Sequence, residues 1–206
     1  MTASKRAFDV TLAILGAVLL ALPAVLLVII LLVCQGRPIF YVSERMNAPD
    51  RSFWLWKFRT MHSAIADSGV SGGDKTLRVT RIGKILRQSR LDEVPQIWNI
   101  LRGDMTFVGP RPPLRTYVER RPDLYNQVLK NRPGITGLAT LVLHQREARL
   151  LATCRTALET DAVYLCRCVP IKAKLDLIYQ RNQSFRLDIV LLTRTVLKIL
   201  KKGVAG

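Results

Sequence analysis

The order of apolar and polar positions divides the chain into one long apolar block and a mixed, basic remainder. Residues 10–34 carry no charged side chain; Lys5 and Arg6 precede this block, and Arg37 and Arg45 follow it. As a straight helix the block would be about 37 Å long, enough to cross a hydrocarbon core of about 30 Å. The apolar region of a cleaved signal peptide is shorter, about 7–15 residues. The pattern therefore predicts a retained membrane anchor over residues 1–36.

Pro23 lies in the middle of this block and leaves two geometries open. A proline inside a helix removes one backbone hydrogen bond and collides with the preceding turn. The result is either a kinked helix that spans the membrane, or a sharp bend that returns the helix to the face it entered. Basic residues on both flanks are typical of two cytoplasmic ends. Because the whole chain is basic, this pattern does not decide between the two geometries.

The residues after the anchor predict a mainly helical α+β domain that begins with a hairpin. Residues 38–45 and 52–59 are rich in β-branched and aromatic side chains, and the turn-like segment 46–51 separates them. This arrangement indicates one β-hairpin. Residues 63–75 are polar and rich in glycine, which predicts a mobile loop. Such a loop is either a surface connection or a segment that closes over a substrate.

Three helices are predicted in the remainder of this domain. Residues 80–87 predict a short basic helix. Residues 92–102 predict a second helix, with Pro95 tolerated in its first turn and Gly103 as its stop. Residues 187–202 place apolar side chains on one face and basic side chains on the other. This last helix either lies at a membrane interface or packs on the core with a solvated basic face.

Composition narrows the class of partner. The formal net charge is +17, which favours nucleic acid, anionic lipid or a phosphate-rich substrate. Of the four cysteines only Cys166 and Cys168 are close together, and no second pair or nearby histidine completes a zinc site. The cysteines therefore indicate free thiols in a reducing compartment.

The segment with the most candidate chemistry is 87–113. Asp92 and Glu93 are adjacent at a predicted helix start, a position that favours ionised carboxylates. Such a pair either stabilises the first helical turn, or holds a divalent metal, or acts as nucleophile or base. The stiff run 109–112 fixes an arginine, Arg111, in a way that suits bidentate phosphate binding. Further arginines lie close in sequence: Arg87, Arg90 and Arg102.

Several long motifs in a fixed order resemble one family. The chain is similar to the bacterial sugar transferases, the monotopic polyprenyl-phosphate phosphoglycosyl transferases, and in particular to the small members with a single catalytic domain. The resemblance extends from the anchor to the last predicted helix. The matching motifs are KFRTM (57–61), LDEVPQ (91–96), GDM (103–105), VGPRP (108–112), RPGITG (132–137), LDLIY (175–179) and SFRLD (184–188).

The resemblance implies an enzyme that takes a UDP-sugar and undecaprenyl phosphate and yields undecaprenyl-diphospho-sugar and UMP. This reaction would be the first membrane step of exopolysaccharide or glycoconjugate synthesis. Asp92 would match the nucleophile and a Mg²⁺ ligand, and Glu93 would assist metal or proton handling. The other positions that match substrate- or phosphate-binding residues are Lys57, Arg59, Arg87, Arg111, Asp176 and Asp188.

The resemblance also implies a location and a set of partners. Residues 1–36 would form a re-entrant helix bent near Pro23, and residues 37–206 a catalytic domain on the cytoplasmic face of the bacterial inner membrane. The expected partners are the UDP-sugar, undecaprenyl phosphate and membrane lipid, without nucleic acid; a homo-oligomer is left open. The alternative is a membrane-tethered basic protein that binds anionic lipid or nucleic acid. In that protein Asp92 and Glu93 would be dispensable.

Two departures from the family pattern limit these expectations. Leu22 precedes Pro23 where family members often carry serine, whose hydroxyl could satisfy a freed backbone carbonyl. After Gly137 many members read WAQVNGR, whereas this chain reads LATLVLHQR and ends that stretch with Arg146. Because this region could help to set the sugar preference, the sequence predicts neither the sugar nor the pathway. It also leaves open whether Arg146 replaces the family arginine.

Overall fold

A computed structural model describes residues 2–62, 69–70 and 72–204 of the chain. This part is mainly helical with two small sheets, which confirms the predicted α+β class. The helices are α1 (Ala3–Gln35), α2 (Arg81–Ser89), α3 (Gln96–Arg102), α4 (Arg115–Arg120), α5 (Pro122–Val128), α6 (Leu138–Ala152), α7 (Ala157–Val163), α8 (Val169–Arg181) and α9 (Phe185–Val204). Shorter helical segments are the 3₁₀ helices η1 (Gly73–Arg78) and η2 (Leu91–Glu93) and the π-helical segment η3 (Tyr164–Cys168).

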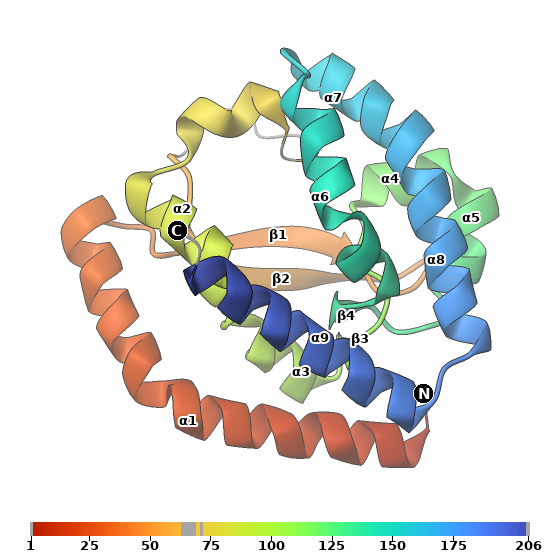
Figure 1. The fold of residues 1–206 in the computed structure, drawn as a ribbon, viewed down its shortest axis with the longest axis horizontal. Helices are drawn as coiled ribbons and strands as arrows, with labels where there is room; N and C mark the ends of the chain where they lie inside the picture. Colours follow the sequence, from red (N-terminus) through yellow and green to blue (C-terminus); the bar gives the residue numbers. More distant parts are fainter. Residues whose placement is uncertain (1, 63–68, 71, 205–206) are drawn as a thin grey trace.

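The anchor is a single bent helix. Helix α1 continues through Pro23 without a break, and Figure 1 shows it turning part-way along its length as it passes around the domain. Its apolar side chains are largely exposed; Leu19, for example, is 77% exposed. In the part of the chain that the structure describes, α1 alone is long and apolar enough to cross a membrane.

Both ends of α1 are fastened to the same domain. Near the N-terminus, Lys5 Nζ lies 2.5 Å from Asp188 Oδ2 on α9, and the Arg6 guanidinium donates to two carbonyl oxygens at the end of α3. At the other end, Arg59 donates to two carbonyl oxygens at the end of α1, at 2.6 and 2.9 Å. These carbonyls lack intrahelical partners, so the guanidinium satisfies them. The two ends of the anchor therefore rest on one body of protein.

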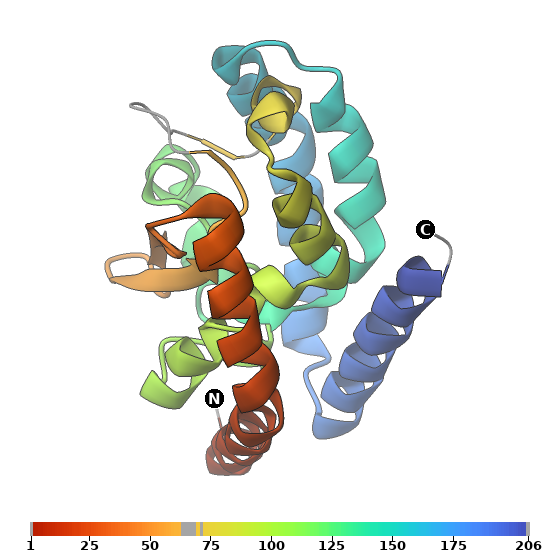
Figure 2. The same cartoon turned by 90° about the vertical axis from the view of Figure 1, so that its left-hand side faces the viewer.

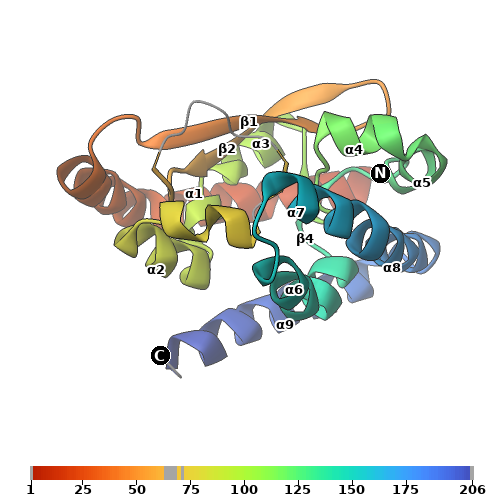
Figure 3. The same cartoon turned by 90° about the horizontal axis from the view of Figure 1, so that it is seen from above.

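The predicted hairpin is confirmed, and a second sheet accompanies it. Strand β1 (Phe40–Met46) pairs antiparallel with β2 (Ser52–Phe58), with Phe40 opposite Phe58. Strand β3 (Thr106–Val108) pairs parallel with β4 (Gly134–Thr136), a pairing that was not predicted from the sequence. Figures 2 and 3 show the hairpin on one side of the domain and α9 on the opposite side, with α6 and α8 between them.

The helical predictions hold with one difference near the carboxylates. Helix α2 matches the predicted basic helix, α9 the predicted C-terminal helix, and Gly103 ends α3 with a φ of +89°. The predicted helix from Asp92, however, is divided: η2 is a separate 3₁₀ turn and α3 begins at Gln96. Of the predicted loop 63–75, residues 63–68 and 71 lie outside the described residues, and its end belongs to η1.

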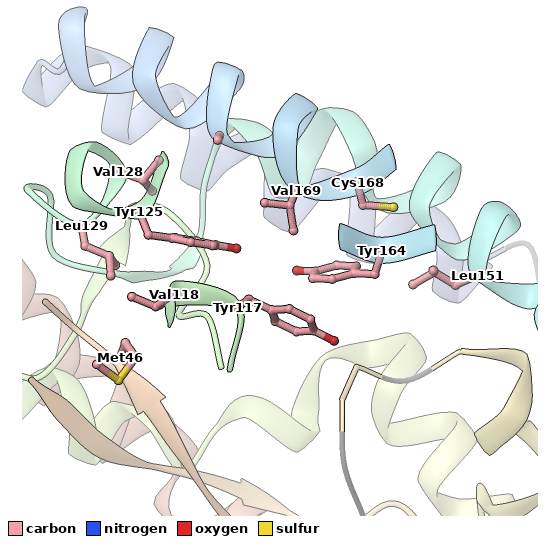
Figure 4. Close-up of a cluster of buried hydrophobic side chains, with 11 residues drawn as sticks. Met46, Tyr117, Val118, Tyr125, Val128, Leu129, Leu151, Tyr164, Cys168 and Val169 are labelled. Carbon is pink, nitrogen blue, oxygen red and sulfur yellow. The ribbon is translucent and has the colours of Figure 1, made fainter. Parts of the chain in front are cut away.

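The largest buried cluster joins α4, α5 and α8 to the end of β1. The ring centroids of Tyr117 and Tyr164 are 4.8 Å apart, and Figure 4 shows the side chains of Tyr125 and Tyr164 pointing toward one another. Met46, the last residue of β1, packs in the same cluster. Because α8 and β1 share this core, the residues they carry are held in fixed relative positions.

Candidate active site

Glu93 lies at the centre of a cluster of cations. Its Oε1 atom is 3.1 Å from Lys57 Nζ and 2.5 Å from Arg111 Nη2, and its Oε2 atom is 3.3 Å from Arg90 Nη1. Burial opposes ionisation of the Glu93 carboxyl, but the charges of Arg111, Lys57 and Arg90 outweigh burial and hold its pKa well below the usual range. Glu93 is therefore a carboxylate that stays ionised at neutral pH, surrounded by three positive charges.

Asp92 is buried beside this cluster but takes no part in its ion pairs. Its side chain accepts no hydrogen bond and forms no ion pair within the described part of the chain. Burial raises the pKa of Asp92, the charge of Glu93 adds to that effect, and Lys57 and Arg111 oppose it. The helix start expected to favour ionised Asp92 is a single 3₁₀ turn, and burial outweighs it. Two adjacent carboxyls with opposite pKa shifts are typical of residues with different chemical roles.

Lys57 reaches Glu93 because α3 lies along the open edge of β2. The Asn99 side chain accepts a hydrogen bond from Trp56 N at 3.2 Å and donates one to Trp54 O at 2.8 Å, so its amide pairs with the strand as another strand would. Burial lowers the pKa of Lys57 to about 8, although Glu93 opposes this shift. The role of Asn99 was missed by sequence reasoning, because its partners lie more than 40 residues away.

Arg90 positions the two carboxylates through its backbone. It has a φ of +62°, and in the described residues no other residue except glycine has a positive φ. Left-handed backbone is unfavourable for a side chain of this kind and is often found at functional sites. Arg90 ends α2 and precedes η2, so this turn places Asp92 and Glu93 directly after the helix.

Arg111 is held where two motif segments approach each other closely. A Cβ atom on Gly109 would lie 2.4 Å from the carbonyl oxygen of Arg132, and one on Gly134 would lie 2.2 Å from the Gly109 nitrogen. Only glycine allows this approach, which backbone hydrogen bonds of 2.8 and 2.9 Å complete. Arg111 Nη1 donates to the carbonyl oxygen of Ile135 in β4 at 3.3 Å, which directs the guanidinium toward Glu93.

The structure separates the two remaining basic residues that were predicted to bind substrate. Arg87 lies near the carboxylates: its Nε donates to Thr60 Oγ1 at 2.9 Å, and its charge lowers the pKa of Asp92. Arg59 instead binds the carbonyl oxygens at the end of α1. The structure therefore groups Lys57, Arg87 and Arg111 with the carboxylates and places Arg59 at the anchor.

The two acidic residues of the C-terminal motifs also lie in different surroundings. Asp176 is buried in α8, where burial raises its pKa to about 7 and Lys172 opposes the shift. Asp188 accepts hydrogen bonds from Lys5 at 2.5 Å and from the Tyr179 hydroxyl at 2.6 Å. The carbonyl oxygen of Val108 in β3 lies 3.1 Å from the same Tyr179 hydroxyl. Asp188 thus connects α1, α8, α9 and β3, and its carboxylate is directed to the N-terminal end of the anchor.

A further polar set, partly buried, joins α6, η3 and α8 after the stretch in which the sequence departs from the family pattern. Lys172 Nζ is 3.0 Å from Glu147 Oε2 and 3.1 Å from the Tyr164 hydroxyl. The charge of Glu147 also contributes to raising the pKa of Arg111. Sequence reasoning missed these residues, whereas Arg146, which it singled out, is exposed.

The carboxylates fit a divalent cation that is also held by substrate. Glu93 Oε2 is buried and accepts no hydrogen bond from the described residues, and Asp92 beside it has no ion pair. The described residues contain no group of three or more His, Cys, Asp or Glu that could hold a metal alone. Mg²⁺ often binds one or two carboxylates together with substrate phosphates, so this donor set is compatible with it.

Comparison with known proteins places the chain in a family. The family model described as "Bacterial sugar transferase" matches residues 1–202. The chain belongs to the bacterial sugar transferase family. This membership confirms the resemblance found in the motifs, and the apolar helix α1 agrees with a family that is membrane-bound.

Relatives of this sugar transferase differ in length and in the sugar they are named for. It is 32% identical over 203 residues to the UDP-N-acetylgalactosamine-undecaprenyl-phosphate N-acetylgalactosaminephosphotransferase of Aeromonas hydrophila. The aligned region covers 95% of this chain and 43% of that protein. It is 33% identical over 199 residues to the uncharacterized sugar transferase EpsL of Bacillus subtilis (strain 168), covering 95% and 87%. It is 32% identical over 173 residues to a UDP-glucose:undecaprenyl-phosphate glucose-1-phosphate transferase of Xanthomonas campestris pv. campestris, covering 82% and 33%. The chain thus spans less than half of the first and third relatives.

Proposed function

We propose that the protein transfers a phosphosugar from a UDP-sugar to undecaprenyl phosphate, with release of UMP. The observation that carries this proposal is the carboxyl pair: Asp92 has no ion pair among the described residues, while Glu93 holds three cations beside it. Guanidinium and ammonium groups at fixed positions suit a diphosphate. An adjacent carboxyl that no ion pair occupies can attack phosphorus in its ionised form, and the charges of Lys57, Arg111 and Arg87 favour that form against the effect of burial.

The reaction proceeds in two displacements. A carboxylate oxygen of Asp92 attacks the sugar-proximal phosphorus, the bond from that phosphorus to the bridging oxygen breaks, and UMP leaves with that oxygen. The phosphosugar is then an acyl phosphate on Asp92. A phosphate oxygen of undecaprenyl phosphate attacks the same phosphorus, which breaks the bond to Asp92 and gives undecaprenyl-diphospho-sugar. Splitting one transfer into two displacements is the general advantage of covalent catalysis.

The surrounding residues support both displacements. Arg111 and Lys57 neutralise the phosphate oxygens as negative charge shifts toward the leaving group. Glu93 keeps these cations in place, and Arg90 and Arg87 complete the positive surroundings. A Mg²⁺ ion bound by Asp92 and Glu93 would supply additional neutralisation of the diphosphate. The names of the relatives from Aeromonas and Xanthomonas support an undecaprenyl phosphate acceptor, and their different sugars leave the donor sugar of this chain open.

Product analysis tests this function. Purified protein is incubated with undecaprenyl phosphate, Mg²⁺ and a panel of UDP-sugars, and UMP release is measured. We expect UMP with at least one UDP-sugar, and no UMP when Asp92 is replaced by asparagine. The alternative, a membrane-tethered protein that binds anionic lipid through its basic surface, predicts no UMP with any donor and vesicle binding that falls steeply with salt. That pair of results would contradict the proposal.

The anchor is proposed to be re-entrant, with the catalytic domain on the cytoplasmic face of the inner membrane. This topology is supported by the contacts of Lys5, Arg6 and Arg59, which hold both ends of α1 against one domain. A helix that crossed the bilayer would place its ends on opposite sides. A Thr2→Cys variant in a background without other cysteines tests the topology by labelling in intact cells. Efficient labelling from the periplasm would contradict it; labelling only after permeabilisation is expected.

A further inference from the structure

Arg45 is a positive charge beside the candidate site that no acidic side chain of the described residues balances. It lies on β1, is partly buried and forms no ion pair there. Its Nε atom donates to Ser43 Oγ and its Nη1 atom to the carbonyl oxygen of Pro112, each over 3.4 Å. Both bonds are longer than the usual range of about 2.7–3.2 Å. Within the described part of the chain, Nη2 donates to no residue, so it can meet a ligand.

The acidic side chains close to Arg45 along the hairpin and at the site already have other partners. Glu44, its neighbour on β1, pairs with Arg115 at 2.5 Å. Glu93 is shared by the three cations that surround it. Burial lowers the pKa of Arg45 and the charge of Arg111 adds to this effect, but a guanidinium stays protonated at neutral pH. The hairpin therefore brings a permanent charge to the site without a counter-ion.

Arg45 and Lys57 project from the same face of the hairpin. Tyr41 lies opposite Lys57 in the register of the two strands, and Arg45 lies four residues farther along β1. Opposite residues share a face, and so do alternate residues of one strand, so the two Cα atoms are about 13 Å apart along one face. Burial lowers the pKa of Lys57, and the charges of Arg111 and Arg45 add to this effect. Side chains of this length can converge on the two ends of one diphosphate.

The turn after Arg111 fixes the position of Arg45. The Arg45 side chain and the backbone nitrogen of Met46, at 3.0 Å, donate to carbonyl oxygens of the two prolines that follow Arg111. The charge that acts most strongly on Arg45 is that of Arg111. Besides burial, the pKa of Asp92 responds to Glu93 and to three cations that do not include Arg45. Arg45 thus extends the positive surface past Arg111, on the side away from Asp92.

We propose that Arg45 binds the uridine-side phosphate of the UDP-sugar and stabilises the charge that this phosphate gains as UMP leaves. The proposal rests on the proposed function. When Asp92 attacks the sugar-proximal phosphorus, the bridging oxygen departs with the bonding electrons, so the uridine-side phosphate changes from a monoanion to a dianion. Arg111 and Lys57 already share their charge with Glu93. A guanidinium without a carboxylate partner stabilises the developing dianion more strongly, because no internal anion competes for it.

Nucleotide binding without turnover tests the proposal. UMP and uridine are titrated separately into the full chain in detergent. Arg45→Met removes the charge and keeps an unbranched side chain, whereas Arg45→Lys keeps the charge. Arg51→Met is the matched control, because Arg51 is an exposed arginine of the same hairpin whose Nε donates to Asn47 Oδ1 at 3.1 Å.

We expect Arg45→Met to raise the Kd for UMP by about tenfold to a hundredfold, the range for losing one hydrogen-bonded charge, and to leave the Kd for uridine unchanged. Arg45→Lys should raise the Kd for UMP less, and Arg51→Met should keep the wild-type value. A wild-type Kd for UMP in Arg45→Met, or an equal loss of affinity for UMP and uridine, would overturn the assignment. These titrations decide the role of Arg45 even if no UDP-sugar gives UMP, which would be the failure of the proposed function.

Rapid mixing separates phosphate binding from a purely structural role of Arg45 in holding the turn after Arg111. Formation of the phosphosugar adduct from UDP-sugar and its discharge to undecaprenyl phosphate are timed separately. Arg45→Met should slow formation by about tenfold or more and leave discharge at the wild-type rate, because UMP has left before discharge begins. A structural role would displace Arg111 and slow both steps, so equal slowing of the two would contradict the proposal.

Discussion

Replacing Asp188 with asparagine separates a structural role of this residue from a role in substrate binding. Its carboxylate is 3% exposed and pairs with Lys5 Nζ, whose side chain is 10% exposed. The asparagine variant leaves that ammonium buried without a counter-ion. Removing one partner of a buried ion pair costs about 3–5 kcal/mol. For a chain of this size, a loss of that order lowers the Tm by roughly 6–20 °C.

Thermal unfolding in detergent, followed by tryptophan fluorescence, measures this effect. Asp123→Asn is the control, because Asp123 is an exposed carboxylate paired with Arg121 and its loss should cost less than about 1 kcal/mol. Combining Lys5→Met with Asp188→Leu should recover most of the stability, since an apolar pair can replace a buried ion pair. Below its Tm, the Asp188→Asn protein should keep the wild-type KM for UDP-sugar. A wild-type Tm with a raised KM would refute this reasoning and return Asp188 to the substrate site.

Three further outcomes are expected. EDTA should abolish UMP release and added Mg²⁺ should restore it; full turnover in chelator would exclude a required divalent cation. Arg111→Lys keeps the charge but loses the fork that meets Glu93 and phosphate, so the KM for UDP-sugar should rise about tenfold to a hundredfold in steady-state assays. Asp176 has a pKa of about 7 in the folded protein, against an ordinary value of 3.8. Between these two pH values the folded protein keeps a proton that the unfolded chain releases, so the free energy of unfolding falls as the pH rises from about 4 to about 7. Asp176→Asn should therefore show a flatter dependence of Tm on pH, and an unchanged slope would contradict the assignment.

The elements that could be predicted from the sequence are those with a local signal. The anchor is an unbroken apolar run, the hairpin is rich in β-branched and aromatic residues on both sides of a turn-like segment, and Gly103 ends α3 as a helix stop does. The β3–β4 pair has strands of only three residues, and Thr106 pairs with Gly134 at a distance along the chain that leaves no periodic pattern. Its presence explains why both segments carry glycines, but the pairing itself could not be predicted.

The candidate site could be predicted in its parts but not in its geometry. The motifs identified Lys57, Glu93 and Arg111, which the structure brings together. Arg59 and Asp188 lie in equally strong motifs, yet their charges are directed to the anchor, because the partners are set by tertiary contacts. In the case of Lys5 and Asp188, the partners are separated by 183 positions. A single sequence records that a charge is present, but not which distant group it meets.

The central claim is that Asp92 carries the phosphosugar between donor and acceptor. Intact-protein mass spectrometry of the wild type, given UDP-sugar and Mg²⁺ without undecaprenyl phosphate, tests it most directly. We predict that the mass of the wild-type protein increases by one phosphosugar and that peptide analysis locates this adduct on Asp92. The Asp92→Asn protein should form no adduct. If the Glu93→Gln protein still forms one, that adduct should also be on Asp92. Addition of undecaprenyl phosphate should remove the adduct. An adduct on Glu93, or steady turnover by the Asp92→Asn protein, would contradict the account.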